Sequence, residues 1–138
     1  DTFKREFVSG RLAPLDAGQT MAQMAPASVR MMSGPNTSAK DLAFMESLMS
    51  ETPEDAYRAA IEYLVTFDQR AAQEHYAMPC LLIGGEDDPA SPARTMEKMA
   101  SKIPNAEIHV FPGRHMTPVE QAEAVNPVIR AFLDRIDP

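Results

Sequence analysis

The pattern of hydrophobic and polar positions changes near residue 76. Before it, apolar residues recur at intervals of three and four, which is the spacing of amphipathic helices. This spacing predicts short helices over residues 1–12, 16–24, 27–32, 38–50 and 52–67. After it, the pattern predicts a strand over residues 80–83, a helix over 93–102, a second strand over 106–111 and a final helix over 117–135. The chain is therefore predicted to be a helical region followed by a βαβα unit.

The first predicted strand ends in a turn that carries acidic residues. Residues 80–83 are apolar without alternation, which favours a strand covered on both faces, as in a parallel sheet. Gly84 and Gly85 allow sharp backbone angles where the strand ends. Asp87 and Asp88 follow, so they are expected at the carboxyl end of a parallel strand, where open α/β sheets place their ligands.

Several side chains are expected to begin helices or to form their buried sides. Ser91 is predicted to cap the helix over 93–102, and Thr117 with Glu120 to form a capping box before the final helix. The helix that begins near Thr52 is expected to bury Ala56, Ala59, Ala60, Tyr63, Leu64 and Phe67. The final helix is expected to bury Ala122, Val125, Ile129, Phe132, Leu133 and Ile136.

Composition limits the classes of partner. The 138 residues suffice for one domain with one core. The net charge of −7 comes from interspersed acids and bases, which argues against nucleic acid as a partner, because nucleic acid needs a basic face. No apolar run approaches the roughly 20 residues of a membrane span. The single cysteine, Cys80, excludes a disulfide framework and indicates a reducing compartment, so we expect a cytoplasmic protein.

The carboxyl ends of the two predicted strands bring carboxylates and an imidazole together. Loops that follow neighbouring parallel strands can touch, which places Asp87 or Asp88 within reach of His115. A carboxylate that accepts a hydrogen bond from one imidazole nitrogen fixes the tautomer and leaves the other nitrogen as a general base. Such a pair supplies two of the three residues of a nucleophilic triad, the acid and the histidine. The alternative is that the aspartates are ordinary surface residues and that His115 is only a packed side chain.

Other side chains offer weaker chemistry. His109 lies inside the second strand without metal-ligand spacing around it, and His75 is expected in a solvated connector, so neither predicts a metal site. The Gly84–Gly85 turn is followed by acids, whereas a phosphate loop needs a basic residue. We therefore predict no metal and no cofactor. Cys80 is expected to be a buried small hydrophobic residue rather than a reactive thiol.

Methionine is abundant in the helical region. Such residues at helical spacing are typical of an ordinary core, and this is the first interpretation. The second is a pliable apolar wall over a ligand pocket, because methionine adapts to irregular shapes. Six of the ten methionines are concerned: Met21, Met24, Met31, Met32, Met45 and Met49.

The second half of the chain resembles the C-terminal half of the α/β-hydrolase superfamily. In that family the acid of a serine–acid–histidine triad stands three residues after a glycine and four before a proline, a pattern that Gly85, Asp88 and Pro92 fit. The resemblance therefore favours Asp88 over Asp87 as the acid and makes His115 the histidine of the triad. The matching residues are Met78–Asp88, Pro92, Ile103–Ala106, Gly113–His115, Glu120, Asn126 and Phe132–Leu133.

The upstream part resembles a narrower branch of the family. Thr52–Tyr57 and Phe67–Arg70 are similar to the cap of 3-oxoadipate enol-lactonase-like hydrolases. The resemblance implies an α/β fold with a helical cap over residues 1–75 and the C-terminal βαβα part of an α/β-hydrolase core over residues 76–138. It also implies an esterase or lactonase that acts on an ester, lactone or similar small molecule, with Asp88 and His115 as catalytic residues.

Two parts of the family's active site do not occur in the sequence, namely a Gly-x-Ser-x-Gly nucleophile elbow and an oxyanion-hole loop. Two parallel strands are also too few for a stable open sheet, and the chain starts at Asp1 without methionine. We therefore expect a fragment, inactive by itself, whose bare strand edge pairs with the missing N-terminal half or with a second copy of this chain. Two alternatives stay open: a family member with non-hydrolytic chemistry, such as a lyase or cofactor-free oxygenase, and a catalytically silent binding module.

Overall fold

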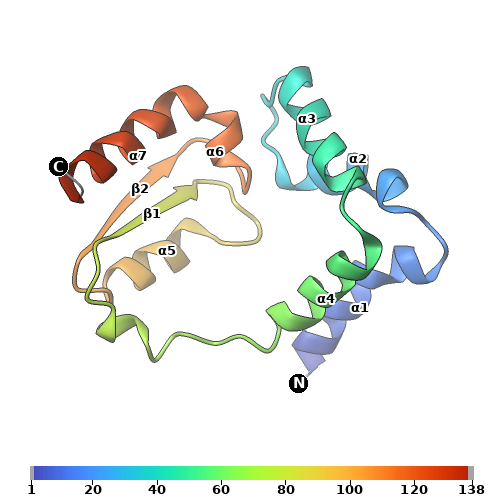
Figure 1. Cartoon of the computed structure of the whole chain (residues 1–138), viewed down its shortest axis with the longest axis horizontal. Helices are drawn as coiled ribbons and strands as arrows, with labels where there is room; N and C mark the ends of the chain where they lie inside the picture. The colour runs from blue at the N-terminus through green and yellow to red at the C-terminus, as the bar shows by residue number, and fades with distance from the viewer. Residues whose placement is uncertain (1, 137–138) are drawn as a thin grey trace.

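The computed structural model describes residues 2–136. Helices α1–α4 form a four-helix region, and the elements from β1 onward form a βαβα unit; Figure 1 shows the two side by side, joined by the segment that contains η1. The elements are α1 Thr2–Asp16, α2 Met21–Met32, α3 Ala39–Ser50, α4 Glu54–Leu64, the 3₁₀-helix η1 Gln73–His75, β1 Cys80–Gly85, α5 Ala93–Ala100, β2 Ala106–Phe111, α6 Thr117–Glu120 and α7 Ala122–Ile136.

The first helix is longer than predicted. α1 continues through Pro14 to Asp16, whereas the sequence pattern predicts an end near Leu12. Proline removes one backbone hydrogen bond from a helix, which is why it usually marks an end. Here Leu12 and Leu15 are both buried in the same cluster, at 6% and 5% exposure, and this shared burial accounts for the continuation.

The prediction of two short helices over residues 16–24 and 27–32 is wrong, because residues 21–32 form one helix. Thr20 caps it: its hydroxyl accepts from the Gln23 backbone N–H, and its own N–H donates to Gln23 Oε1. Pro26 lies inside the helix. The buried residues of α2 lie on both sides of the proline, so one continuous apolar face holds the helix together; they are Met21, Met24, Ala25 and Val29.

The four-helix region holds its core in two clusters. The first joins α1, α2 and α4 and contains Leu12, Leu15, Met21, Met24 and Ile61. The second joins α2 and α3 and contains Val29, Leu42 and Met45. Met116 and Val119 pack against the second cluster, so apolar contacts continue from the four-helix region into α6. α3 begins as predicted, with the Ser38 hydroxyl accepting from the Asp41 N–H.

The predicted buried face of α4 is wrong. Ile61 is its buried residue and Tyr57 packs against the same cluster, whereas Tyr63 and Leu64, together with Phe67 beyond its end, are more than half exposed. Both sets of residues have helical spacing, so the sequence offers two faces. The partner helix selects between them: Arg58, next to Tyr57, donates to Asp16 at the end of α1 over 2.7 Å.

The two strands pair in parallel, as predicted, with Cys80 opposite Ala106 and Gly85 opposite Phe111. β2 has the predicted bounds, and β1 extends through both glycines to Gly85. In Figure 1, α5 and α7 lie on opposite sides of the strand pair. Leu82 of β1 and Val125 of α7 are buried at 6% and 0% exposure. A Cβ on Gly84, on the same face of β1 as Leu82, would lie 3.5 Å from Met96, so this face of the strand meets α5.

Three expectations about the last helices are wrong. Residues 117–135 do not form one capped helix, because α6 ends at Glu120 and α7 begins at Ala122. Thr117 does not cap the helix; its hydroxyl donates to the Arg114 carbonyl. Of the predicted buried side of α7, Val125 is fully buried, but Leu133 and Ile136 are exposed.

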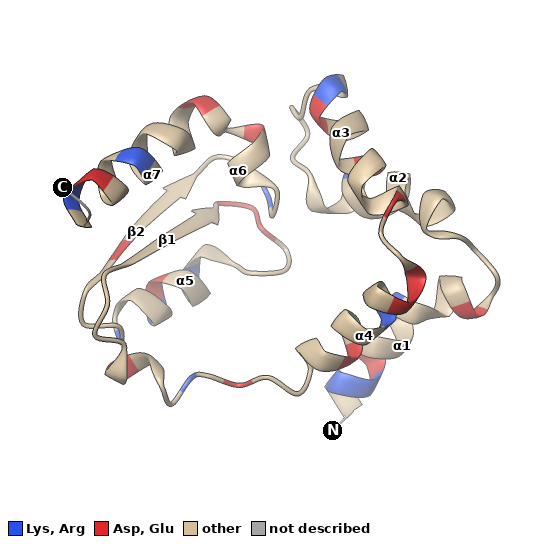
Figure 2. Ribbon diagram, in the orientation of Figure 1, with Lys and Arg blue, Asp and Glu red and all other residues tan. Residues whose placement is uncertain are grey.

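Charged residues are mixed along the elements. Figure 2 shows acidic and basic residues on the same helices, including α1, α3, α5 and α7, and acids gathered in the loop after β1. Among residues 2–136, no helix is long and apolar enough to cross a membrane.

Candidate functional site

The candidate site forms where the loop after β1 meets the loop after β2. Gly85 ends β1 so close to the second loop that a Cβ there would lie 2.3 Å from the Arg114 carbonyl oxygen and 2.6 Å from Thr117 Oγ1. No side chain fits in that space. Glycine at this position therefore lets the carboxyl ends of the two strands come together.

Asp88 is held by the turn in which it lies. Its Oδ1 accepts hydrogen bonds from the backbone N–H groups of Ala90 at 2.7 Å and Ser91 at 3.0 Å. Ser91 therefore does not cap α5 as predicted; its N–H serves Asp88 instead, and Pro92 occupies the N-cap position. The Asp88 residue is buried, at 7% exposure, although its neighbour Asp87 is exposed.

The second carboxylate oxygen of Asp88 faces His115. The distance from Asp88 Oδ2 to His115 Nδ1 is 2.9 Å, which is hydrogen-bonding distance. Asp87 makes no such contact; its backbone N–H donates to the Gly113 carbonyl. The contact is thus the one that the resemblance favours, Asp88 rather than Asp87.

The charge on Asp88 is stabilised inside the turn. Burial by itself would raise the pKa of the Asp88 carboxyl, but hydrogen bonds from His115, Ser91 and Ala90 outweigh it and lower the pKa below its usual value of 3.8. Asp88 is therefore ionised at neutral pH and accepts a hydrogen bond from Nδ1–H. That arrangement leaves the His115 Nε2 atom as the basic nitrogen of the ring.

The opposite side of His115 is open. Its side chain is 39% exposed, and among residues 2–136 no group hydrogen-bonds Nε2. A pocket of about 170 Å³ lies beside the pair and is lined by Asp88, His115, Ser91 and Met96, among others. Within the described residues no serine or cysteine side chain hydrogen-bonds His115, so the pair has an acid and a base but no nucleophile in contact.

A larger pocket of about 400 Å³ lies mainly in the four-helix region, and its lining includes Met116, the chain neighbour of His115. Its lining is mostly apolar and includes Met32, Met45 and Met49 from α2 and α3. Met21 and Met24 belong to the core cluster instead. Met45 belongs both to the second core cluster and to the lining of this pocket, so the core interpretation fits Met21, Met24 and Met45, and the ligand-pocket interpretation stays a prediction.

The remaining candidate residues lie outside this site. His109 stacks on Phe111 within β2, with ring centroids 6.4 Å apart, and His75 lies beside Glu74 at the surface. Cys80 is partly buried. Over residues 2–136 no cluster of three or more His, Cys, Asp or Glu residues could hold a metal ion.

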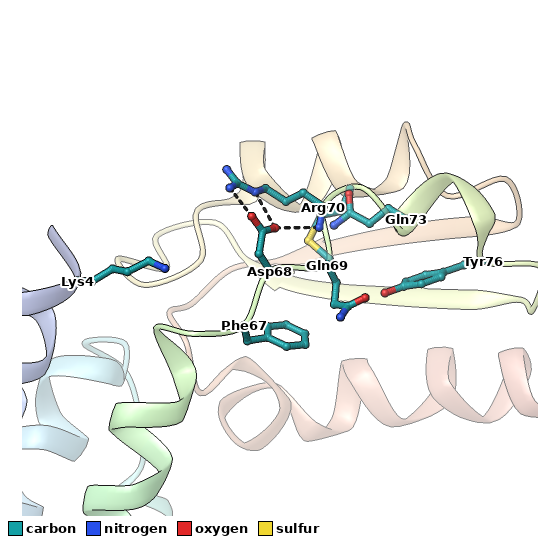
Figure 3. A pocket seen from close by; sticks show the side chains of 8 residues that line it. Lys4, Phe67, Asp68, Gln69, Arg70, Gln73 and Tyr76 are labelled. Atoms are coloured by element: carbon teal, nitrogen blue, oxygen red, sulfur yellow. Dashed lines mark hydrogen bonds and ion pairs between the residues drawn. The ribbon is translucent and has the colours of Figure 1, made fainter. Parts of the chain in front are cut away.

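A separate pocket of about 390 Å³ is lined by the segment before η1, together with Lys4 of α1 and Met99 of α5 (Figure 3). Arg70 pairs with Asp68 through its guanidinium group and its backbone N–H, and these hydrogen bonds hold the pKa of the Asp68 carboxyl below its usual value. The 3₁₀-helix η1 begins after this segment, with Ala72 at its N-cap. Lys4 from α1 points toward Asp68 in Figure 3, a proximity that no local sequence signal indicates.

Local sequence reasoning assigned Glu120 to a capping box and missed its partners. Instead of closing a capping box, its carboxylate accepts hydrogen bonds from the Gly34 N–H at 2.6 Å and from Thr37 Oγ1 at 2.9 Å. These partners lie more than 80 positions earlier in the chain. The only local signals are the glycines Gly34 and Gly113, whose missing side chains leave room for this carboxylate.

The model of the alpha/beta hydrolase fold family matches residues 8–122, and the chain therefore belongs to that family. The family and fold that the motifs predict are thereby confirmed. The Asp88–His115 contact lies where the family resemblance places its acid and histidine.

Individual relatives match parts of the chain. A poly(3-hydroxyalkanoate) depolymerase from Ectopseudomonas oleovorans is 40% identical over 57 residues, which are 41% of this chain and 20% of that protein. The 3-oxoadipate enol-lactonase 2 of Acinetobacter baylyi is 25% identical over 83 residues, which are 60% of this chain and 31% of that protein.

Solved structures match nearly the whole chain. A thermophilic esterase from Thermogutta terrifontis superposes with a TM-score of 0.79 at 24% identity, over 95% of this chain and 48% of that one, a likeness that shows the fold. The chain thus spans about half the length of that esterase and matches 31% or less of the two curated relatives.

Proposed function

We propose that this chain is the cap and C-terminal part of a serine-type hydrolase that cleaves an ester, a lactone or a similar small carbonyl compound. The observation that carries the proposal is the 2.9 Å contact between Asp88 Oδ2 and His115 Nδ1, with Nε2 left open. In this proposal residues 1–75 act as the helical cap and residues 76–138 complete the catalytic core. The nucleophile and the oxyanion-hole donors come from residues outside this chain.

Each residue of the pair has a defined step. His115 Nε2 takes the proton from the serine hydroxyl as its oxygen attacks the substrate carbonyl, and it returns that proton to the leaving oxygen. Water then repeats the cycle: His115 takes its proton, the hydroxyl attacks the acyl carbonyl, and the serine oxygen leaves with the proton. Asp88 orients the ring and stabilises the imidazolium during both halves of the reaction.

The substrate class rests on two supports. One relative is named as a poly(3-hydroxyalkanoate) depolymerase and the other as an enol-lactonase. A poly(3-hydroxyalkanoate) and an enol-lactone both contain ester bonds. The mostly apolar pocket of about 400 Å³ whose lining includes Met116 suits a substrate with an apolar part. The first compounds to assay are therefore activated esters, lactones and hydroxyalkanoate oligomers of increasing chain length.

The missing half is also the proposed partner. Among the described residues β1 pairs with β2 on one side only, which leaves a row of N–H and C=O groups on its other edge. In this proposal a strand from the N-terminal half occupies that edge. A second copy of this chain is the other candidate for the same position.

The test uses the complete protein and this chain by itself. The complete protein is expected to hydrolyse members of the ester and lactone panel, and His115→Ala is expected to lower kcat by about 10³-fold or more. The 138-residue chain alone is expected to show no turnover above background, because the pair has no nucleophile to activate. Turnover by the isolated chain that His115→Ala abolishes, or an inert complete protein, would contradict the proposal.

A further inference from the structure

Glu120 joins two parts of the chain that are far apart in sequence. Its Oε1 accepts from the Gly34 N–H at 2.6 Å and from the Thr37 hydroxyl at 2.9 Å, both in the turn between α2 and α3. Its Oε2 accepts from the backbone N–H of Arg114 at 3.4 Å. One partly buried carboxylate thus connects the four-helix region to the residue that precedes His115.

The surroundings are shaped for this carboxylate. A Cβ on Gly113 would lie 2.8 Å from Glu120 Oε2, and one on Gly34 would lie 3.0 Å from the same oxygen. Gly113 also has a φ of +132°, which side chains rarely adopt. Two glycines therefore admit Glu120 between the turn and the loop that carries His115.

The same loop is fastened to the end of α2 by two more hydrogen bonds. The Arg114 guanidinium donates to the Met31 carbonyl at 3.1 Å, and the Met116 N–H donates to the Met32 carbonyl at 3.3 Å. Both chain neighbours of His115 are thus tied to the four-helix region. The imidazole itself is 39% exposed and has Asp88 as its hydrogen-bond partner, so its position depends on how these neighbours are held.

We propose that Glu120 is a positioning residue, which clamps the loop of residues 113–117 to the turn of residues 33–37 and so keeps His115 within hydrogen-bonding distance of Asp88. This inference rests on the proposed function, because it treats the Asp88–His115 pair as the acting acid and base. Glu120 does not touch the ring. It acts through Arg114 and through the turn at the end of α2.

The test compares two isosteric substitutions in the complete protein. Glu120→Gln keeps the shape but replaces one acceptor oxygen by an N–H₂ group, which must face the N–H of either Gly34 or Arg114. Glu123→Gln removes the same charge from an exposed position in α7 whose side chain makes no hydrogen bond among residues 2–136, and it is the matched control. Thr37→Val removes the hydroxyl whose one proton is within reach of both Glu120 Oε1 and the Gly34 carbonyl, and it keeps the Gly34 N–H. It is the milder variant if Glu120→Gln does not fold.

The first readout does not need activity. In Glu120→Gln, amide hydrogen exchange at Gly34, Arg114 and Met116 is expected to speed up by about tenfold, the loss of one charged hydrogen bond, while exchange in β1 and β2 stays unchanged. The NMR signal of the His115 Nδ1 proton is expected to broaden or disappear. Thr37→Val is expected to give a smaller acceleration at Gly34. If amide exchange and the His115 signal in Glu120→Gln are the same as in the control Glu123→Gln, the inference is overturned.

The second readout is kinetic, with the concentration of active sites measured by titration. Glu120→Gln is expected to lower kcat by about tenfold and to leave KM within about twofold, because the clamp holds the base and not the substrate. A variant that loses only folded protein keeps its kcat per active site, and that result would also overturn the inference. If the wild-type protein hydrolyses none of the panel, the proposed function fails, and the exchange and NMR readouts still decide whether the clamp exists.

Discussion

Asp88 is the residue on which the site depends, and it is held from two sides. Backbone N–H groups of its own turn bind Oδ1, and the imidazole of His115 binds Oδ2. A carboxylate fixed in this way needs no rearrangement when a ligand arrives, which is the condition for an efficient orienting group. The neighbouring Asp87 has the same chemistry but an exposed side chain, and it offers a matched comparison.

The first prediction concerns this comparison. Asp88→Asn in the complete protein is expected to lower kcat by about 10³- to 10⁴-fold, because an amide can donate to Nδ1 and so favours the wrong imidazole tautomer. Asp87→Asn is expected to stay within about twofold of wild type. Ester hydrolysis by the two variants, measured side by side, checks both values. Equal losses would mean that charge in the loop, and not the Asp88–His115 contact, matters.

The second prediction concerns pH. The pKa of Asp88 is lower in the folded protein than its usual value of 3.8, so the unfolded state binds the proton more readily. The stabilisation is therefore present above about pH 4 and is lost as the pH falls through the lower folded pKa. The free energies of unfolding of the wild type and of Asp88→Asn, measured in urea, should differ most at neutral pH. This difference should become smaller below pH 3.8. A difference that grows on acidification would contradict this assignment.

At the scale of elements, the end of β1 is the tightest junction. Gly85 lies against the backbone of the loop that carries His115, and two of the atoms that a Cβ would meet are carbonyl oxygens, those of Arg114 and Gly113. Backbone atoms cannot rotate away as a flexible side chain can. The contact between the β1 and β2 loops therefore depends on a missing side chain rather than on an attractive one.

The third prediction tests that junction. Gly85→Ala is expected to lower the free energy of unfolding by about 3 kcal/mol and to separate Asp88 from His115. Gly10→Ala, in the exposed part of α1 with no atom within 4 Å of the added Cβ, should instead raise it by about 0.5–1 kcal/mol. Thermal or urea unfolding of the complete protein gives both values. Equal effects at the two positions would show that the close approach at Gly85 is not required.

At the scale of the whole molecule, the sheet is narrow and apolar side chains are exposed at several places along the chain. Among the described residues it has two strands, and an isolated pair of strands is marginal in water. Several large apolar side chains are more than 50% exposed, including Phe44, Leu48, Phe67 and Leu133. Apolar surface of this kind favours association.

The fourth prediction follows from that surface. The 138-residue chain alone is expected to self-associate, or to bind the N-terminal half of the protein when both are present. Light scattering over a dilution series measures the first, and co-purification of separately tagged halves measures the second. Leu81→Lys, which places a charge on the β1 edge, should weaken either interaction. A folded, dilute monomer would show that the four helices suffice to protect the sheet.

Local patterns determined the elements and the chemistry of the site. The run at 80–83 predicts a parallel strand because apolar residues without alternation suit a sheet covered on both faces, and the run at 106–111 predicts a second strand; both strands occur. The glycine–aspartate–proline spacing, read through the family resemblance, selects Asp88 for the contact with His115. These features depend on residues within a few positions of one another, so the sequence alone contains them.

Only the tertiary structure decided which faces are buried and what Glu120 does. α4 has two faces with helical spacing, and the position of α1 selects Tyr57 and Ile61. α1 and α2 pass through Pro14 and Pro26 because buried residues on both sides of each proline keep the helix together. Glu120 looks like half of a capping box, but its partners lie more than 80 positions earlier, in a turn that only folding brings beside it. Local sequence can state what a side chain is able to bind, whereas the packing of distant segments determines which partner it meets.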